Sequence, residues 1–190
     1  PTEAAVACDR QCLIDATDTY VAALAAHDPA RAPLADNIVF VENVKKMQPG
    51  EGLWKSTVKA PDSFQIHVPD EINQTAGYLA MMTAMMPPPA PQGASPEERA
   101  RLAETSEPTE QPVIVAFRLK FDGDGKISEA EHLYSTVREA QLANLQTPRP
   151  GIFTEIPEAS RMAHAELIRI GESYYDALDD NNGELTPFAP

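Results

Sequence analysis

Apolar residues recur at helical spacing between Gln11 and Ala26. One face of this segment carries Leu13, Thr17, Tyr20 and Leu24, flanked by Ile14 and Val21. Polar and charged residues occupy the opposite face, which is typical of a helix that buries a single stripe. The pattern predicts an amphipathic helix that ends just before Pro29, because a proline disfavours helical geometry at the residue preceding it.

Five later segments have the composition and alternation of β-strands. They are Ile38–Val41, Ser63–Val68, Gly77–Met85, Val113–Phe121 and Lys126–Tyr134. The clearest is Val113–Phe121, in which every second residue is apolar and the residues between include Arg118 and Lys120. Leu53–Val58 follows a Gly-rich turn and fits either a short helix or an extended segment.

A proline-rich, polar stretch covers residues 87–112, between two of the expected strands. It encloses one short helical pattern, Ser95–Leu102, in which Ser95 and Glu98 have the spacing of a capping box. Insertions of this length are disordered, form a lid or reach toward another subunit, and the sequence leaves all three open.

One helix followed by several antiparallel strands and a closing hairpin at Asp122–Gly125 describes an α+β domain. We expect a curved antiparallel sheet that wraps the N-terminal helix, within residues 1–150. Residues 151–190 are expected to form a helical extension.

The charge balance narrows the range of partners. With 29 acidic and 15 scattered basic residues, the net charge is -14, which disfavours nucleic acid and anionic membranes. No apolar run is long enough to span a bilayer, and no signal peptide is recognisable. We expect a soluble protein, with the cytoplasm favoured; a periplasmic or secreted location would require a leader removed before Pro1.

Metal and cofactor motifs are not apparent. The only two cysteines, Cys8 and Cys12, lack the further Cys or His pair of a structural zinc site. They can form a local disulfide if this end of the chain is not helical. No phosphate-binding glycine loop or nucleotide fingerprint occurs, so we expect neither a metal nor a cofactor.

Several short motifs resemble the ketosteroid isomerases and their NTF2-like and SnoaL-like relatives. Tyr20–Leu24, Asp28 and Leu34–Asp36 before a β-run resemble the opening of these proteins, and Lys120–Ile127 resembles their closing turn. The resemblance implies a cone-shaped α+β fold around a pocket. It also implies a homo-oligomer, either a dimer or a trimer.

The same resemblance suggests site residues. Tyr20 corresponds to the tyrosine that hydrogen-bonds a developing enolate oxygen, and Glu42, after a gap of about two residues, corresponds to the carboxylate base. The family's protonated aspartate corresponds to Phe117, which counts against steroid isomerisation. Each residue also has an ordinary explanation, since tyrosine is common in cores and glutamate on solvated strand faces.

Other candidates come from strand faces and from the aromatic content. His132 is a third acid-base candidate, because its charge switches near neutral pH. Residues that could contact a substrate are Trp54, His67, Phe117, Arg118 and Tyr134. Competing explanations exist. Trp54 can be a core residue, and solvated surface positions are equally compatible with His132, His67 and Arg118.

The C-terminal segment repeats the beginning of the chain. An offset of 154 residues, without gaps, places Leu13 on Leu167, Ile14 on Ile168, Tyr20 on Tyr174, Ala23-Leu24 on Ala177-Leu178 and Pro33 on Pro187. Residues 157–190 therefore resemble the first helix and turn of a second such unit. Two unrelated amphipathic helices would produce a similar match. Because a lone helix cannot bury its own stripe, we expect it to be docked.

These observations favour a cofactor-independent lyase, isomerase or dehydratase that transfers protons on a small, apolar and aromatic substrate. Because proteins that release formaldehyde from lignin-derived diaryl compounds resemble this superfamily, a lignin-type aromatic lyase is one candidate. The alternative is a non-catalytic module that binds a hydrophobic ligand or mediates assembly. The balance leans toward an enzyme.

Overall fold

The computed structural model describes residues 7–188. The chain divides into two compact units, with the boundary between Pro148 and Arg149. None of the helices within residues 7–188 combines the length and the apolarity that crossing a lipid bilayer requires.

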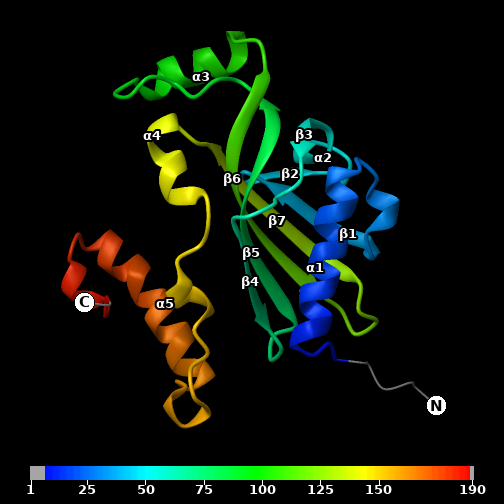
Figure 1. Cartoon of the computed structure of the whole chain (residues 1–190), viewed down its shortest axis with the longest axis vertical. Helices are drawn as coiled ribbons and strands as arrows, with labels where there is room; N and C mark the ends of the chain where they lie inside the picture. The colour runs from blue at the N-terminus through cyan, green and yellow to red at the C-terminus, as the bar shows by residue number, and fades with distance from the viewer. Residues whose placement is uncertain (1–6, 189–190) are drawn as a thin grey trace. The chain divides into compact units, whose positions relative to one another are not determined.

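The first unit opens with helix α1, Arg10–Ala25 (Figure 1). Asp9 caps it, since its side chain accepts a hydrogen bond from the Cys12 backbone N–H. The expected stripe is buried, including Leu13, Tyr20 and Leu24, each at most 1% exposed. His27, with φ at 57°, ends the helix, and the 3-10 turn η1, Pro29–Arg31, leads into the sheet.

Seven strands form one curved sheet around α1 (Figure 1). They are β1 Leu34–Glu42, β2 Lys45–Met47, β3 Thr57–Lys59, β4 Gln65–Asp70, β5 Thr75–Met86, β6 Thr109–Phe121 and β7 Ile127–Thr136. Their order is β2-β1-β7-β6-β5-β3, with β4 also paired to β5. The predicted α+β cone is confirmed, and the undecided segment is a short helix, α2 Leu53–Ser56, followed by β3.

One expectation about the sheet is wrong. The sheet is mixed, because β1 and β7 run parallel, whereas every other pair is antiparallel. Local alternation cannot reveal this pairing, because the two strands are far apart in the chain. Its register places Phe40 opposite Ala130 and Glu42 opposite His132.

Strand β6 shows how the sheet divides inside from outside. Val113, Val115, Phe117, Leu119 and Phe121 are all buried against the core, as the alternation predicted. Ile114, Ala116, Arg118 and Lys120 alternate with them and are partly exposed on the other face.

The proline-rich insertion contains regular structure. Strand β6 begins inside it, and the pairing of β6 with β5 ends at Thr109 opposite Met86. A proline-rich loop then leads to helix α3, Pro96–Thr105, capped by the Ser95 side chain, which accepts a hydrogen bond from the Glu98 backbone N–H. After β7 the unit ends with helix α4, Glu139–Leu142, and the 3-10 turn η2, Ala143–Leu145.

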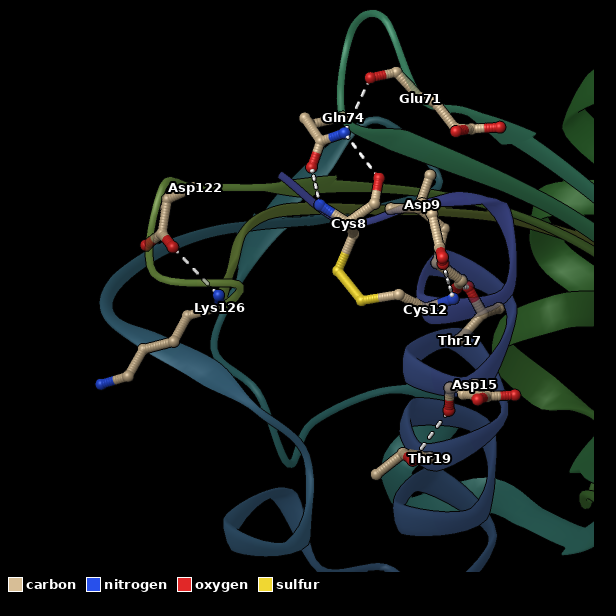
Figure 2. Close-up of a disulfide and its surroundings, with 11 residues drawn as sticks. Cys8, Asp9, Cys12, Asp15, Thr17, Thr19, Glu71, Gln74, Asp122 and Lys126 are labelled. Atoms are coloured by element: carbon tan, nitrogen blue, oxygen red, sulfur yellow. Dashed lines mark hydrogen bonds between the residues drawn. A yellow bond between two sulfur atoms is a disulfide. The ribbon is translucent and has the colours of Figure 1, made fainter. Parts of the chain in front are cut away.

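A disulfide joins Cys8 to Cys12 at the start of α1 (Figure 2). Cys8 precedes the helix, so the local bond considered above is compatible with the fold. Gln74, in the β4–β5 turn, hydrogen-bonds both the backbone N–H and the backbone carbonyl of Cys8. Its side chain accepts from the Cys8 N–H at 2.8 Å and donates to the Cys8 carbonyl at 2.9 Å.

Reducing this disulfide should lower the free energy of unfolding by only about 1–2 kcal/mol, because the closed loop is short and Gln74 still holds Cys8. Urea unfolding with and without reductant measures the difference. A Cys8→Ser/Cys12→Ser variant is the control, since its midpoint must not respond to reductant. An unchanged wild-type midpoint would contradict the prediction.

Between residues 149 and 188, the second unit consists of 3-10 turns and one helix. Its elements are η3 Pro150–Phe153, η4 Glu158–Ser160, α5 His164–Asp179 and η5 Gly183–Leu185. The first and last residues of α5 and η5 lie 154 residues after those of α1 and η1, which is the offset of the sequence repeat. Even the left-handed residue after the helix recurs, as His27 in one unit and Asn181 in the other.

The two helices differ in burial. Leu13 and Leu24 of α1 are fully buried, whereas their equivalents in α5, Leu167 and Leu178, are 54% and 61% exposed. The second unit thus reproduces the opening helix and turn without a sheet of its own. That α5 is docked on another surface remains a prediction.

Candidate active site

Glu42 is a carboxylate enclosed by the first unit. It is the last residue of β1 and is 3% exposed. Both of its oxygens accept from the Leu53 backbone N–H, at 3.1 and 3.2 Å, at the beginning of α2. Asn43 and Val44 follow with positive φ, so the chain turns away while the Glu42 side chain stays inside.

Gly52 makes room for this carboxylate, a role that the sequence did not reveal. Its φ is 59° and its ψ is -124°, a conformation that suits glycine. A Cβ atom at this position would overlap Glu42 Oε1. The Gly-rich turn was recognisable from the sequence, but its contact with Glu42 depends on tertiary structure.

His132 connects Glu42 to Tyr20. Its Nδ1 lies 3.2 Å from Glu42 Oε2, and its Nε2 lies 2.9 Å from the Tyr20 hydroxyl. Because a carboxylate accepts, we assign the His132 proton to Nδ1; Nε2 then accepts from the Tyr20 O–H. We call Tyr20, His132 and Glu42 the buried row.

The pKa values of Tyr20 and His132 are shifted in the directions that this placement of the protons requires. Burial raises the pKa of Tyr20, and the Glu42 charge acts in the same direction, while the neighbouring Trp54 N–H opposes both. Burial lowers the pKa of His132, against the opposing effect of Glu42. At neutral pH the phenol is therefore protonated and the imidazole neutral.

Aromatic rings surround the buried row. Phe117 stacks on His132 with centroids 4.0 Å apart, and Phe40 meets the same ring edge-on at 4.9 Å. Trp54 contacts Tyr20 edge-on at 5.3 Å and is 1% exposed, so it is a core residue. Within residues 7–188 its indole Nε1 makes no hydrogen bond of acceptable distance and angle, although it is near enough to the Tyr20 hydroxyl to oppose the rise in the pKa of that phenol.

The structure thus brings together five of the predicted site residues: Tyr20, Glu42, His132, Trp54 and Phe117. Tyr20 and Glu42 do not face each other across an empty cavity. The His132 ring lies between them and hydrogen-bonds to both. The three polar side chains form a continuous hydrogen-bonded path for a proton, closed to solvent in this conformation.

Two other candidates lie elsewhere. Arg118 is on the outer face of the sheet, where it pairs with Glu129 and Glu131, so the structure does not bring it to the buried row. Its neighbour Phe117 points inward, and strand alternation forces Arg118 to the other side. His67 pairs with Asp18 at 2.8 Å, apart from the buried row.

Tyr134 follows His132 on the same face of β7 and packs against the core. Burial raises the pKa of its phenol, and the charge of Glu42 adds to the effect. Tyr134 also lines an open cavity of about 460 Å³ between β7, the proline-rich loop and α3. It therefore belongs both to the surroundings of the buried row and to an accessible pocket.

No group of three or more His, Cys, Asp or Glu side chains in the described part of the chain is arranged to hold a metal ion.

The shifted pKa of His132 predicts a pH-dependent stability. The unfolded chain binds a proton at this residue near pH 6.5, whereas the folded state binds it only at lower pH. Between these values the unfolded state holds more protons, so stability must fall as pH decreases below about 6.5, by up to ~1.4 kcal/mol per pH unit. Urea unfolding at several pH values measures this slope.

His132→Gln provides the comparison, because it removes the titrating group. The difference in slope between the wild type and this variant reports His132 together with its coupling to Glu42, since the other titrating groups are shared. Identical slopes in the two proteins would contradict the prediction.

Comparison with known proteins gives matches only among solved structures. No family model and no curated protein matches the chain. A protein from Pseudomonas putida KT2440, described provisionally as a polyketide cyclase, is 9% identical, with a TM-score of 0.43, over 70% of this chain and 96% of that one.

Two further structures are similar. An NTF2-like superfamily protein from Salmonella enterica serovar Typhimurium is 10% identical, with a TM-score of 0.39, over 77% of this chain and 96% of that one. A ketosteroid isomerase-like protein from Erwinia carotovora atroseptica is 13% identical, with a TM-score of 0.39, over 67% and 95%. At such values the similarity says nothing about the activity of this chain.

Proposed function

We propose that the first unit is a cofactor-independent enzyme that transfers protons on a small, apolar and aromatic substrate, as a lyase, isomerase or dehydratase. The buried row carries the proposal. Tyr20, His132 and Glu42 join a phenol, an imidazole and a carboxylate by direct hydrogen bonds inside an aromatic core. These are the groups that acid-base catalysis uses.

Structural stability gives a weaker explanation for the row. Removing polar and ionisable groups from water costs several kcal/mol per ion, and well-packed apolar residues often stabilise a core equally well. Such groups with shifted pKa values are typical of functional sites. The pKa of Tyr20 is raised and that of His132 is lowered, which keeps a donor and an acceptor ready at neutral pH.

In the proposed reaction, His132 Nε2 takes a proton from the substrate and Glu42 stabilises the resulting imidazolium. Tyr20 and the unpaired Trp54 N–H donate hydrogen bonds to the oxygen on which negative charge develops. His132 then returns the proton to another carbon or to a leaving oxygen, so no electrons are gained or lost. The substrate must separate Tyr20 from His132, which are 2.9 Å apart in this closed conformation.

The second candidate function is a binding module without catalysis. It is favoured by the exposure of the three side chains, which is 3% or less, and by the position of the open cavity, which Tyr134 lines but the buried row does not. This candidate predicts ligand binding without any proton transfer.

Solvent exchange distinguishes the two candidates without knowledge of the complete reaction. The protein is incubated in D₂O with a panel of aryl ketones and β-hydroxy aryl ketones, and ¹H NMR follows the carbon-bound protons next to the carbonyl. The proposal expects deuterium incorporation into at least one compound above the buffer rate. Binding of a compound whose protons do not exchange would favour the module.

Tyr20→Phe tests which residue is responsible, because it removes the hydroxyl and keeps the ring. Tyr175→Phe is the matched control, since Tyr175 is 72% exposed in the second unit. We expect exchange to fall with the first substitution and to remain with the second.

A further inference from the structure

An open pocket lies beneath the proline-rich insertion, at the end of β7. Its volume is about 460 Å³, within the range of small-molecule sites. We call it the insertion pocket. It is lined by the loop at residues 87–90, by side chains of α3 that include Arg99 and Leu102, and by Tyr134, Arg138 and Gln141 at the end of β7 and the beginning of α4.

Two arginines of the insertion pocket are anchored to the same loop. Arg99, on α3, donates through Nε to the Ala94 carbonyl at 2.9 Å. Arg138, at the beginning of α4, donates through Nη2 to the Ala90 carbonyl at 3.3 Å. Each guanidinium has five N–H donors, so one bond to the backbone fixes its position and leaves donors for a ligand.

The charge of the pocket is opposite to that of the chain. None of its lining residues is Asp or Glu, although the chain has a net charge of -14. Arg118, Arg161 and Arg169 pair with glutamates, whereas in the described part of the chain neither Arg99 nor Arg138 has an ion-pair partner. An anion placed here would meet two guanidinium groups and no carboxylate from the pocket itself.

The other walls are mixed. Pro87, Pro89, Leu102, Ala103 and Tyr134 supply apolar surface, while hydroxyl and amide side chains lie along the β7–α4 side. A planar carboxylate matches the fork of a guanidinium, and a monoanion with an apolar body uses both kinds of wall.

We propose that the insertion pocket binds small aromatic carboxylates through Arg99 and Arg138. The proposal does not depend on the catalytic function proposed above, because it concerns binding by residues outside the buried row. It also gives the insertion a role, since the loop and α3 supply most of the walls.

Titration calorimetry on the full chain tests the proposal with benzoate and cinnamate as probes. Their neutral amides and inorganic phosphate are the comparisons. We expect the carboxylates to bind at least about tenfold more tightly than the amides, corresponding to one or two charge-assisted hydrogen bonds. Amides that bind as tightly as the acids, or phosphate that binds as tightly as either acid, would overturn the proposal.

Substitutions locate the site. Arg99→Gln and Arg138→Gln should each weaken cinnamate binding by about five- to twentyfold. Arg101→Gln is the matched control, because Arg101 is on the same helix but does not line the pocket. Equal losses of cinnamate affinity in all three variants would show that only the net charge of the protein matters, and would refute a specific site.

Amide chemical shifts in the wild type provide a readout independent of any variant. Cinnamate should perturb the loop at residues 87–95, α3 and residues 134–141. Perturbations confined to other parts of the chain would contradict the proposal. Deuterium exchange is measured separately, so a failure of catalysis leaves this result intact, and a failure of binding leaves the catalytic proposal intact.

Discussion

Glu42→Gln is expected to lower the deuterium-exchange rate by ~10²–10⁴-fold while the protein stays folded. The Gln amide has the shape of the carboxylate and can still accept from Leu53 and His132 through one oxygen. It carries no charge, so it cannot stabilise the imidazolium that forms when His132 Nε2 takes a proton from the substrate. The exchange rate of the most responsive aryl ketone, followed by ¹H NMR, measures the effect.

Glu131→Gln is the matched control for this substitution. Glu131 is on β7 beside His132 in sequence, but it faces outward and pairs with Arg118. Its replacement should leave the exchange rate within about twofold, because a surface ion pair contributes little. If both variants keep wild-type exchange, Glu42 has no part in proton transfer.

Gly52→Ala is expected to destabilise the first unit by roughly 3–5 kcal/mol, the largest stability effect that we predict. Two causes add. The backbone conformation at Gly52 is unfavourable for any residue with a Cβ, and the new methyl group would overlap the Glu42 carboxylate. Either α2 moves, or Glu42 leaves the Leu53 N–H and His132.

Gly125→Ala separates these two causes. Gly125, in the β6–β7 turn, has a φ of 74°, and no other atom lies within 4 Å of a Cβ at this position. It should cost only about 1–2 kcal/mol, the strain of a left-handed residue. Urea unfolding of both variants compares their losses of unfolding free energy. Equal losses would show that a methyl group at position 52 does not clash with the Glu42 carboxylate.

The sequence was sufficient for much of the local structure. The stripe on α1 and the alternation in β6 specified which side chains point inward, including Tyr20 and Phe117. These patterns are local, since they follow from the periods of a helix and a strand. Glu42 was named from the family resemblance, and His132 from its place on the last strand and its titration near neutral pH.

The connection between those candidates could not be predicted. It depends on the parallel pairing of β1 with β7, which places Glu42 opposite His132 across 90 residues of chain. Strand alternation shows which residues share a face, but register between distant strands is set by the whole sheet. For the same reason Gly52 was recognised only as a turn residue, although its missing side chain accommodates Glu42.

The most direct test of the account is the protonation state of His132 at pH 7.5, measured by ¹⁵N NMR of the imidazole, with His132→Gln to assign the signals. We predict a neutral ring protonated at Nδ1, with Nε2 unprotonated and accepting from Tyr20. A ring protonated at Nε2, or at both nitrogens, would contradict the buried row as a proton path.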